Sequence, residues 1–145
     1  MFFLYQIIVS ILLILSPIII FFRTIKNKED KNRFKEKFSL INIKRKKGNL
    51  IWFHGASVGE ILSVIPLIKK YEKDKSVKQI LITSSTLSSS SILQKFKFKK
   101  TIHQFYPIDN YYITSKFLNH WQPNLVVFLE SEIWPVMIEN IKKNN

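Results

Sequence analysis

The chain has 145 residues, of which 46% are hydrophobic and 23% charged, and its formal net charge is +13. This composition allows one folded domain and excludes an intrinsically disordered protein. The absence of cysteine excludes disulfides, thiolate metal sites and a cysteine nucleophile. The three histidines, His54, His103 and His120, show no metal-ligand spacing, so we expect no metal, and the glycine spacing matches no dinucleotide fingerprint, so we expect no other cofactor.

The first segment, residues 1–22, reads MFFLYQIIVSILLILSPIIIFF and carries no charged side chain. As a helix it would extend about 33 Å, against about 30 Å for the hydrocarbon core of a bilayer. Pro17 would kink such a helix without preventing it. No basic residues precede the segment and no Ala-x-Ala cleavage site follows it, so a membrane anchor is expected rather than a signal peptide or a buried core helix.

A basic juxtamembrane segment, residues 23–48, follows the anchor. Residues 23–50 hold eleven Lys or Arg and only three acidic residues. Positive residues beside a membrane helix tend to stay in the cytoplasm, which predicts a single-pass protein of the inner membrane with its globular part on the cytoplasmic face. Directly behind a membrane helix, such charge favours membrane phospholipids as the partner over nucleic acid.

From residue 49 onward the pattern changes to alternating strands and helices. Short apolar runs predict strands over residues 50–54, 79–83, 102–105 and 125–129, and LVVFL at 125–129 is the clearest buried run. Helical patterns lie over residues 61–68, 88–98, 112–121 and 133–143. Pro66 predicts a kink or a late first turn, and Pro135 fits the first turn of the last helix.

Continuous apolar strands that alternate with helices predict an α/β fold, with one Rossmann-like parallel sheet over residues 49–145. Ligands of such sheets bind beyond the carboxyl ends of the strands. The loops at residues 54–60, 83–91 and 130–134 should therefore meet at one edge of the sheet.

The first of these loops reads HGASVGE. Gly55 and Gly59 allow a sharp turn, whose backbone N–H groups and helix end would form a seat for an anion. Glu60 is either an acid that stabilises the first turn of the helix or a general base at the mouth of a pocket. Ser57 fits the N-cap of the helix, although GASVG also matches the nucleophile elbow of serine hydrolases, with His103 or His120 as the base.

Two further acidic positions follow the strand at 125–129. Glu130 and Glu132 end a buried strand, where carboxylates are costly unless they are solvated, paired or functional. Glu132 also fits the start of the last helix. Asp109 precedes the helix at 112–121, and we expect it to be the N-cap of that helix.

Four motifs together resemble the N-terminal half of the 3-deoxy-D-manno-octulosonic acid (Kdo) transferases. They are WFHGASVGE at residues 52–60, LITSST at 81–86, FYPID at 105–109 and PNLVVFLESEIWP at 123–135. Their order and spacing, and the apolar N-terminal segment with its basic continuation, match this family. The resemblance covers nearly the whole chain.

The resemblance implies the N-terminal half of a GT-B glycosyltransferase, an inverting enzyme that transfers Kdo from CMP-Kdo to a lipid A precursor, lipid IVA, in lipopolysaccharide biosynthesis. It places the general base at Glu60. The residues that it implies for substrate binding are Ser57, Gly59, Ser84, Thr86, Glu130 and Glu132.

The family's second domain, which binds CMP-Kdo, would lie beyond residue 145, so a truncated or split enzyme with a separately encoded C-terminal domain is expected. Two alternatives remain at this stage. One is a non-catalytic membrane protein that binds lipid A or anionic lipid, and the other is a serine hydrolase that uses Ser57.

Overall fold

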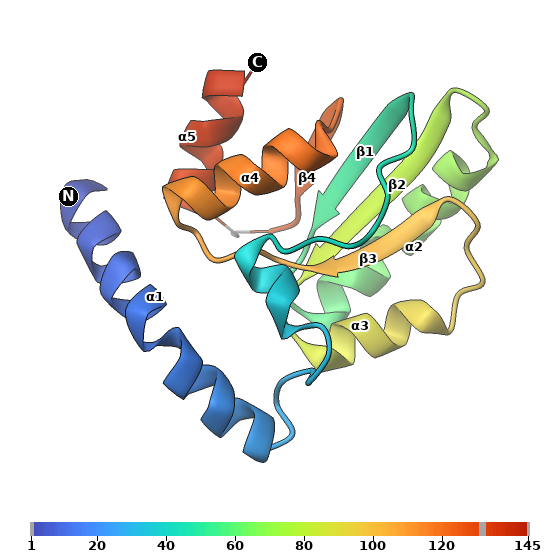
Figure 1. The fold of residues 1–145 in the computed structure, drawn as a ribbon. Coiled ribbons are helices and arrows are strands. Elements are labelled where there is room, and N and C mark those ends of the chain that lie inside the picture. The colour runs from blue at the N-terminus through green and yellow to red at the C-terminus, as the bar shows by residue number, and fades with distance from the viewer. Residues whose placement is uncertain (1, 131–132, 145) are drawn as a thin grey trace. The chain divides into compact units, whose positions relative to one another are not determined.

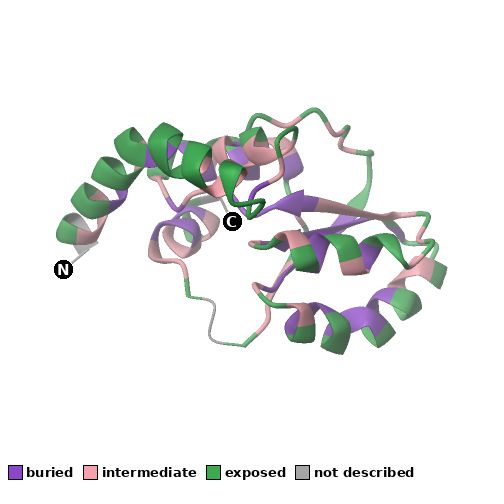
Figure 2. Cartoon of the chain, turned by 90° about the horizontal axis from the view of Figure 1, so that it is seen from below, coloured by how far each residue is buried: buried purple, intermediate pink, exposed green. Residues whose placement is uncertain are grey.

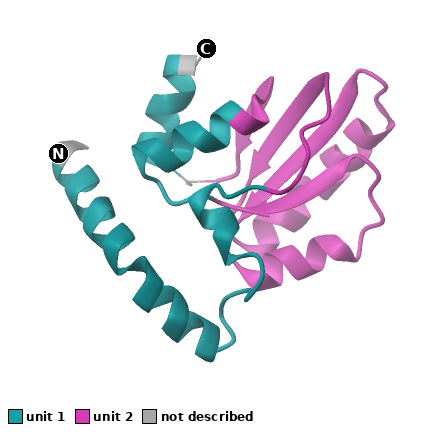
Figure 3. Ribbon diagram, viewed as in Figure 1, with its two compact units in different colours: residues 1–41, 107–119, 133–145 teal, residues 42–106, 120–132 magenta. Residues whose placement is uncertain are grey.

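The computed structural model describes residues 2–130 and 133–144. The chain divides into two compact units, coloured teal and magenta in Figure 3. Unit 1 consists of residues 1–41, 107–119 and 133–145, and unit 2 consists of residues 42–106 and 120–132.

The sheet of unit 2 has four parallel strands in the order β3-β2-β1-β4 (Figure 1). The strands are β1 (Asn49–His54), β2 (Val77–Ser84), β3 (Thr101–Phe105) and β4 (Leu125–Phe128). This order is that of the first four strands in a doubly wound 3-2-1-4-5-6 sheet. The α/β fold with a parallel sheet that the sequence predicts is confirmed.

Helix α2 (Val58–Lys73) buries one face in the core of unit 2 and leaves the other exposed. The core of unit 2 consists of the buried face of α2 packed on alternate residues of β1 and β2. Only alternate residues take part because successive side chains of a strand point to opposite faces of the sheet. Figure 2 shows these buried positions in purple. Pro66 lies inside α2 and the helix continues past it to Lys73.

Helix α3 (Leu87–Gln94) is shorter than the helix expected over residues 88–98. It ends because the sequence after Gln94 alternates lysine and phenylalanine, a period of two that no helix can bury on one side. The chain turns here, with the N–H of Phe98 donating to the carbonyl oxygen of Phe96 at 2.9 Å, and the rings of Phe96 and Phe98 stack with centroids 5.5 Å apart.

Strand β4 is not the fully buried strand that its apolar sequence predicts. It pairs with β1 and lies at an edge of the sheet. Leu125 is exposed and the other three residues of β4 are half-buried. An apolar run of four residues therefore identified a strand but not its place in the sheet, which depends on pairing with distant residues.

Unit 1 contains helix α1 (Phe2–Ile25), the 3-10 helix η1 (Phe34–Phe38), most of α4 (Tyr111–Trp121) and α5 (Pro135–Asn144). Among the described residues, α1 is the one helix long and apolar enough to cross a membrane. Most of its surface is exposed, as the green ribbon in Figure 2 shows. Pro135 is the first residue of α5, as predicted.

The sequence suggested that Asp109 caps α4, and the structure shows that this is wrong. Its carboxylate accepts hydrogen bonds from the backbone N–H groups of Val136 at 3.0 Å and Met137 at 2.8 Å, so it holds the start of α5. The side chain of Asn110 takes the capping role at α4, where it accepts from the N–H of Tyr112 at 3.0 Å. Two neighbouring polar residues thus serve two different helices, a pairing that sequence spacing does not reveal.

Helix α2 provides a matched test of this core. Ile68 is completely buried, whereas its neighbour Leu67 is 39% exposed. We expect Ile68→Ala to lower the free energy of unfolding by about 2–5 kcal/mol, since it leaves a cavity in the core, and Leu67→Ala to cost less than about 1 kcal/mol. Denaturant unfolding of both variants in the same detergent measures the difference. Equal losses would contradict the burial of this face.

Candidate functional site

The carboxyl ends of β1, β2 and β4 meet at one edge of the sheet. The register pairs His54 with Thr83 on one side and with Phe128 on the other. Backbone hydrogen bonds continue past the strand ends, from Gly55 N to Thr83 O and from Leu129 N to His54 O. The predicted meeting of the loops after these strands is therefore confirmed within the described residues.

The turn after β1 begins α2 through reciprocal capping. Ser57 is the N-cap, and its hydroxyl oxygen accepts from the N–H of Glu60 at 3.2 Å. In return, Glu60 Oε2 accepts from the N–H of Ala56 at 2.9 Å, and Oε1 accepts from the Ser57 hydroxyl at 2.6 Å. This is a variant of the capping box, in which the acidic side chain reaches back to satisfy a free N–H at the helix start.

The anion seat predicted at this helix start is thus filled by the chain itself. The carboxylate of Glu60 takes the backbone donor that a bound anion would use. Ser57 is the N-cap and Glu60 lies in the first turn of α2, as predicted, and these structural roles are compatible with a further role of Glu60 as a base. A carboxylate has lone pairs for about four hydrogen bonds, so this arrangement leaves acceptor capacity for a substrate hydroxyl.

The electrostatics of the turn favour an ionised Glu60. Burial of its side chain, which is 9% exposed, acts to raise its pKa. The hydrogen bonds from the Ser57 hydroxyl and from the backbone N–H groups of Ala56 and Ser57 outweigh this effect, and the pKa lies below the usual 4.5. Glu60 is therefore a carboxylate at neutral pH and available to accept a proton.

His54 lies directly before the turn, and its side chain packs in the buried layer under it. It is fully buried, and its Nδ1 lies 3.2 Å from the Thr83 carbonyl oxygen and 3.0 Å from the Thr83 hydroxyl. Its ring stacks on Tyr106 with centroids 3.8 Å apart. Burial lowers the pKa of His54 to about 4, against the opposing effects of the Thr83 carbonyl and the Glu60 charge, so the ring is neutral at pH 7.

The sequence pattern did not single out this supporting layer of His54, Thr83 and Tyr106. The one available signal was a histidine at the end of an apolar strand, directly before the glycine turn. Trp52 completes the layer, because its indole N–H donates to the Thr83 hydroxyl at 2.8 Å.

The two glycines of the turn have different reasons to be there. A Cβ on Gly55 would lie 3.0 Å from Leu129 Cδ1 and 3.1 Å from Glu60 Cβ, so any larger residue here would force the side chains of Leu129 and Glu60 to shift. A Cβ on Gly59 would meet only the Ser57 hydroxyl oxygen, at 3.9 Å. Folding therefore does not need a glycine at position 59, which is exposed on the first turn of α2.

The four remaining predicted site residues differ in their surroundings. Thr86 is exposed and caps α3, since its hydroxyl oxygen accepts from the N–H of Ser89 at 3.2 Å. Ser84 is fully buried, with its hydroxyl 2.8 Å from His103 Nε2, so it lies beneath the surface. Glu130 is exposed, with a φ of 54°, a left-handed conformation that is uncommon for a residue other than glycine. Glu132 lies outside the described residues.

The serine hydrolase hypothesis finds no support at Ser57, whose hydroxyl is bonded to Glu60. The two candidate bases lie in other hydrogen bonds, with His103 Nε2 at the Ser84 hydroxyl and His120 Nε2 2.8 Å from the Ile43 carbonyl oxygen. The G-x-S-x-G pattern here marks a helix cap.

Comparison with known proteins identifies the family. The model of the family described as 3-deoxy-D-manno-octulosonic-acid transferase (Kdo transferase) matches residues 32–145. The chain belongs to the Kdo transferase family. A 3-deoxy-D-manno-octulosonic acid transferase of Rickettsia bellii is 40% identical over 140 residues, which are 97% of this chain and 34% of the relative.

Two more distant Kdo transferases also match. A probable mitochondrial member from Arabidopsis thaliana is 36% identical over 126 residues, covering 85% of this chain and 28% of the relative. The Haemophilus influenzae transferase is 28% identical over 140 residues, covering 94% of this chain and 33% of the relative. The chain thus spans about a third of the length of these relatives.

The two glycines give a matched prediction. We expect Gly55→Ala to lower the free energy of unfolding by about 1–3 kcal/mol, since the added methyl group is overpacked against the side chains of Leu129 and Glu60. Gly59→Ala should be neutral or stabilising by up to about 1 kcal/mol, because alanine is the better helix former. Denaturant unfolding measures both, and a Gly59→Ala loss as large as that of Gly55→Ala would contradict the open surface at position 59.

The capping carboxylate gives a prediction for pH dependence. Because the folded pKa of Glu60 is below 4.5, its charge stabilises the fold fully above pH 4.5, and this contribution is lost as the pH falls through the folded value. Glu60→Gln should therefore be about 1 kcal/mol less stable than the native chain at pH 7, with a difference that shrinks below pH 4.5.

The matched control is Glu139→Gln, on the surface of α5. Glu139 forms an i,i+4 ion pair with Lys143 at 2.7 Å. We expect Glu139→Gln to change the free energy of unfolding by less than about 0.5 kcal/mol. A Glu60→Gln difference that is constant from pH 7 to pH 3 would contradict the role of the charge.

Proposed function

We propose that this chain is the acceptor-side part of an inverting GT-B Kdo transferase, which transfers Kdo from CMP-Kdo to a lipid A precursor, lipid IVA, in lipopolysaccharide biosynthesis. The observation that carries the proposal is the Kdo transferase family match over residues 32–145, which includes the turn that holds Glu60 ionised at the carboxyl edge of the sheet. Family membership supports the reaction class, and the geometry of the turn supports the assignment of the base.

In this proposal Glu60 is the general base. A hydroxyl of the acceptor attacks the anomeric carbon of Kdo, the new C–O bond forms, and the bond from that carbon to the CMP phosphate breaks. The hydroxyl proton passes to the Glu60 carboxylate and then to water. Attack from the face opposite the leaving phosphate inverts the anomeric centre, and the reaction requires no metal or organic cofactor.

The neighbouring residues would bind the acceptor and hold the base. The Ser57 hydroxyl, 2.6 Å from Glu60 Oε1, keeps the carboxylate in place and can rotate toward a substrate oxygen. Gly59 and Thr86 offer exposed surface on the starts of α2 and α3. Glu130 and Glu132 would bind polar groups of the acceptor after β4, and Ser84 would support the site from beneath, where it is buried.

The partners follow from the same proposal. CMP-Kdo would bind mainly to a C-terminal domain, on the same or a separately encoded chain. Helix α1 and the basic residues that follow it would attach the protein to the phospholipids of the cytoplasmic face of the inner membrane. The length and composition of α1 support a single crossing of this membrane, with the globular part on the cytoplasmic face.

Transfer of radiolabelled Kdo tests the assignment of Glu60. The chain should be assayed with a separately expressed C-terminal segment of a Kdo transferase, with CMP-Kdo and lipid IVA supplied in mixed micelles. We expect Glu60→Gln to lower the rate by at least about a hundredfold, since a general base contributes roughly 10²–10⁴. Glu139→Gln is the control and should retain full activity.

Different failures of this assay have different meanings. Unchanged transfer by a folded Glu60→Gln variant would remove Glu60 as the base. Lipid IVA binding with no transfer by the native pair would favour the non-catalytic lipid-binding alternative. A loss of transfer by Gly59→Ala, which the fold tolerates, would support contact between substrate and this exposed position.

A further inference from the structure

The exposed side of helix α2 combines a small apolar area with a group of lysines. Its exposed residues recur at helical spacing and therefore lie on one side of the helix. This outer face of α2 consists of Gly59, Leu62, Ser63, Pro66, Leu67, Lys69, Lys70 and Lys73. The apolar residues lie in the half nearest the turn that holds Glu60, and the lysines lie in the half that ends at Lys73.

Three further exposed lysines adjoin the cationic end of α2, at positions 95, 97 and 99. The phenylalanines between them, Phe96 and Phe98, pack against the core of unit 2. Two contacts hold this segment beside α2. Lys69 Nζ lies 5.7 Å from the centroid of the Phe96 ring, and the Glu72 carboxylate accepts from the N–H of Lys99 at 3.0 Å. The three lysines of α2 and the three of this segment therefore belong to one surface.

Two acidic residues lie close to these six lysines, and the local backbone uses both. Glu72 accepts hydrogen bonds from the N–H groups of Lys99 and Lys100, and Asp74 accepts from the N–H of Ser76 at 2.8 Å. Within residues 2–130 and 133–144, the ion pairs involve other cations, and none of the six lysines takes part in one. Their charges are therefore available to an anionic partner.

The chemistry of this surface favours an anionic lipid leaflet over nucleic acid. Leu62 is 42% exposed and Leu67 is 39% exposed, and such side chains enter the boundary between head groups and acyl chains while lysines attract anionic head groups. Proteins that bind single-stranded nucleic acid stack its bases on aromatic rings. The two rings in this segment, Phe96 and Phe98, pack against the core instead.

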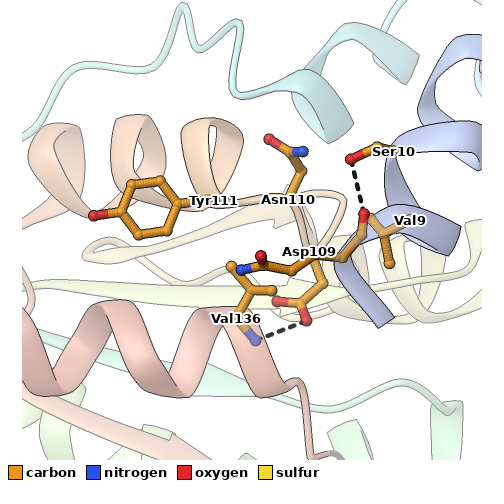
Figure 4. Close-up of a pocket in the computed structure, with 7 residues that line it drawn as sticks. Val9, Ser10, Asp109, Asn110, Tyr111 and Val136 are labelled. Atoms are coloured by element: carbon orange, nitrogen blue, oxygen red, sulfur yellow. Dashed lines mark hydrogen bonds between the residues drawn. The ribbon is translucent and has the colours of Figure 1, made fainter. Parts of the chain in front are cut away.

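The pocket shown in Figure 4 belongs to unit 1 and not to this surface. Its volume is about 130 Å³, and Val9, Ser10, Asp109, Asn110 and Val136 are among the residues that line it. No residue of the outer face of α2 and none of the six lysines lines it. The surface is therefore a candidate for docking an extended partner and not a wall of this pocket.

We propose that the outer face of α2, together with the lysines at positions 95, 97 and 99, docks on the anionic phospholipid leaflet, so that α2 lies along the membrane surface. The inference rests on the proposed membrane attachment through α1 and specifies which face of unit 2 meets the head groups. Gly59 and the turn that holds Glu60 then lie at the level of the head groups, where a lipid acceptor is presented.

Fluorescence quenching by lipid tests this docking, and the absence of native cysteine allows a single labelled position. Leu62→Cys carries an environment-sensitive nitrobenzoxadiazole (NBD) label, and the matched control carries the label at Leu125→Cys, since Leu125 of β4 is similarly exposed, at 45%. The full chain is reconstituted through α1 into vesicles that contain a nitroxide head-group lipid. One set is phosphatidylethanolamine with phosphatidylglycerol, and the other is phosphatidylcholine alone.

We expect the label at position 62 to be quenched at least about twice as strongly as that at position 125 in the anionic vesicles, and the two to be quenched equally in phosphatidylcholine. Equal quenching at both positions in the anionic vesicles would overturn the docking while the chain still floats with the vesicles. Failure of the chain to float with either set of vesicles would overturn the membrane attachment itself. An excess at position 62 that is the same in phosphatidylcholine would overturn the role of the lysines.

Two triple variants separate this surface from the overall charge. We expect Lys69→Gln, Lys70→Gln and Lys73→Gln, combined in one chain, to remove at least about half of the excess quenching at position 62. The control replaces the exposed lysines at positions 44, 46 and 47 with glutamine, which removes the same charge outside α2 and should leave the excess unchanged. Equal losses in the two variants would assign the effect to net charge and contradict docking by this face.

The same labelled chain tests the nucleic-acid alternative. A single-stranded RNA is added to the phosphatidylcholine vesicles, at the phosphate concentration that phosphatidylglycerol supplies in the anionic vesicles. We expect no change in NBD emission at position 62. A response to RNA that exceeds the response to the anionic lipid would assign this surface to nucleic acid and overturn the proposal.

Discussion

The reciprocal capping of Ser57 and Glu60 is the interaction on which the proposed chemistry depends. A buried carboxylate is normally costly, and this one is stabilised because the turn supplies it with donors that would otherwise be unsatisfied at the start of α2. One arrangement therefore solves two problems, the free N–H groups of a helix start and the charge of a buried acid. The same bonds that keep Glu60 ionised also fix its direction at the end of β1.

Much of this arrangement was predictable because it is local in sequence. Strands β1 and β2, the cap at Ser57 and the place of Pro135 follow from spacing over a few residues. The features that the sequence did not predict are set by distant partners. Asp109 serves α5 rather than α4 because residues 136 and 137 fold back onto it, and β4 lies at an edge although its own sequence reads as buried.

The candidate site shows the same division. Glu60, Ser57 and Gly55 could be assigned from one nine-residue motif, and the structure gives each a physical role. His54 was not identified, because its importance comes from Thr83 on a neighbouring strand and Tyr106 beyond β3. For α1, composition indicated membrane contact, whereas the hydrogen bond between Tyr5 and Asp109 joins residues 104 positions apart and no local pattern predicts it.

The place of β4 also determines where the sheet can be extended. One side of the strand pairs with β1, and its other side is an edge of the sheet. Edge backbone groups can accept a further strand from any source, and the short apolar sequence LVVF has no charge or proline to discourage it. In the doubly wound order 3-2-1-4-5-6 a fifth strand pairs with the fourth, so the free side of β4 is the position at which a further segment would extend the sheet.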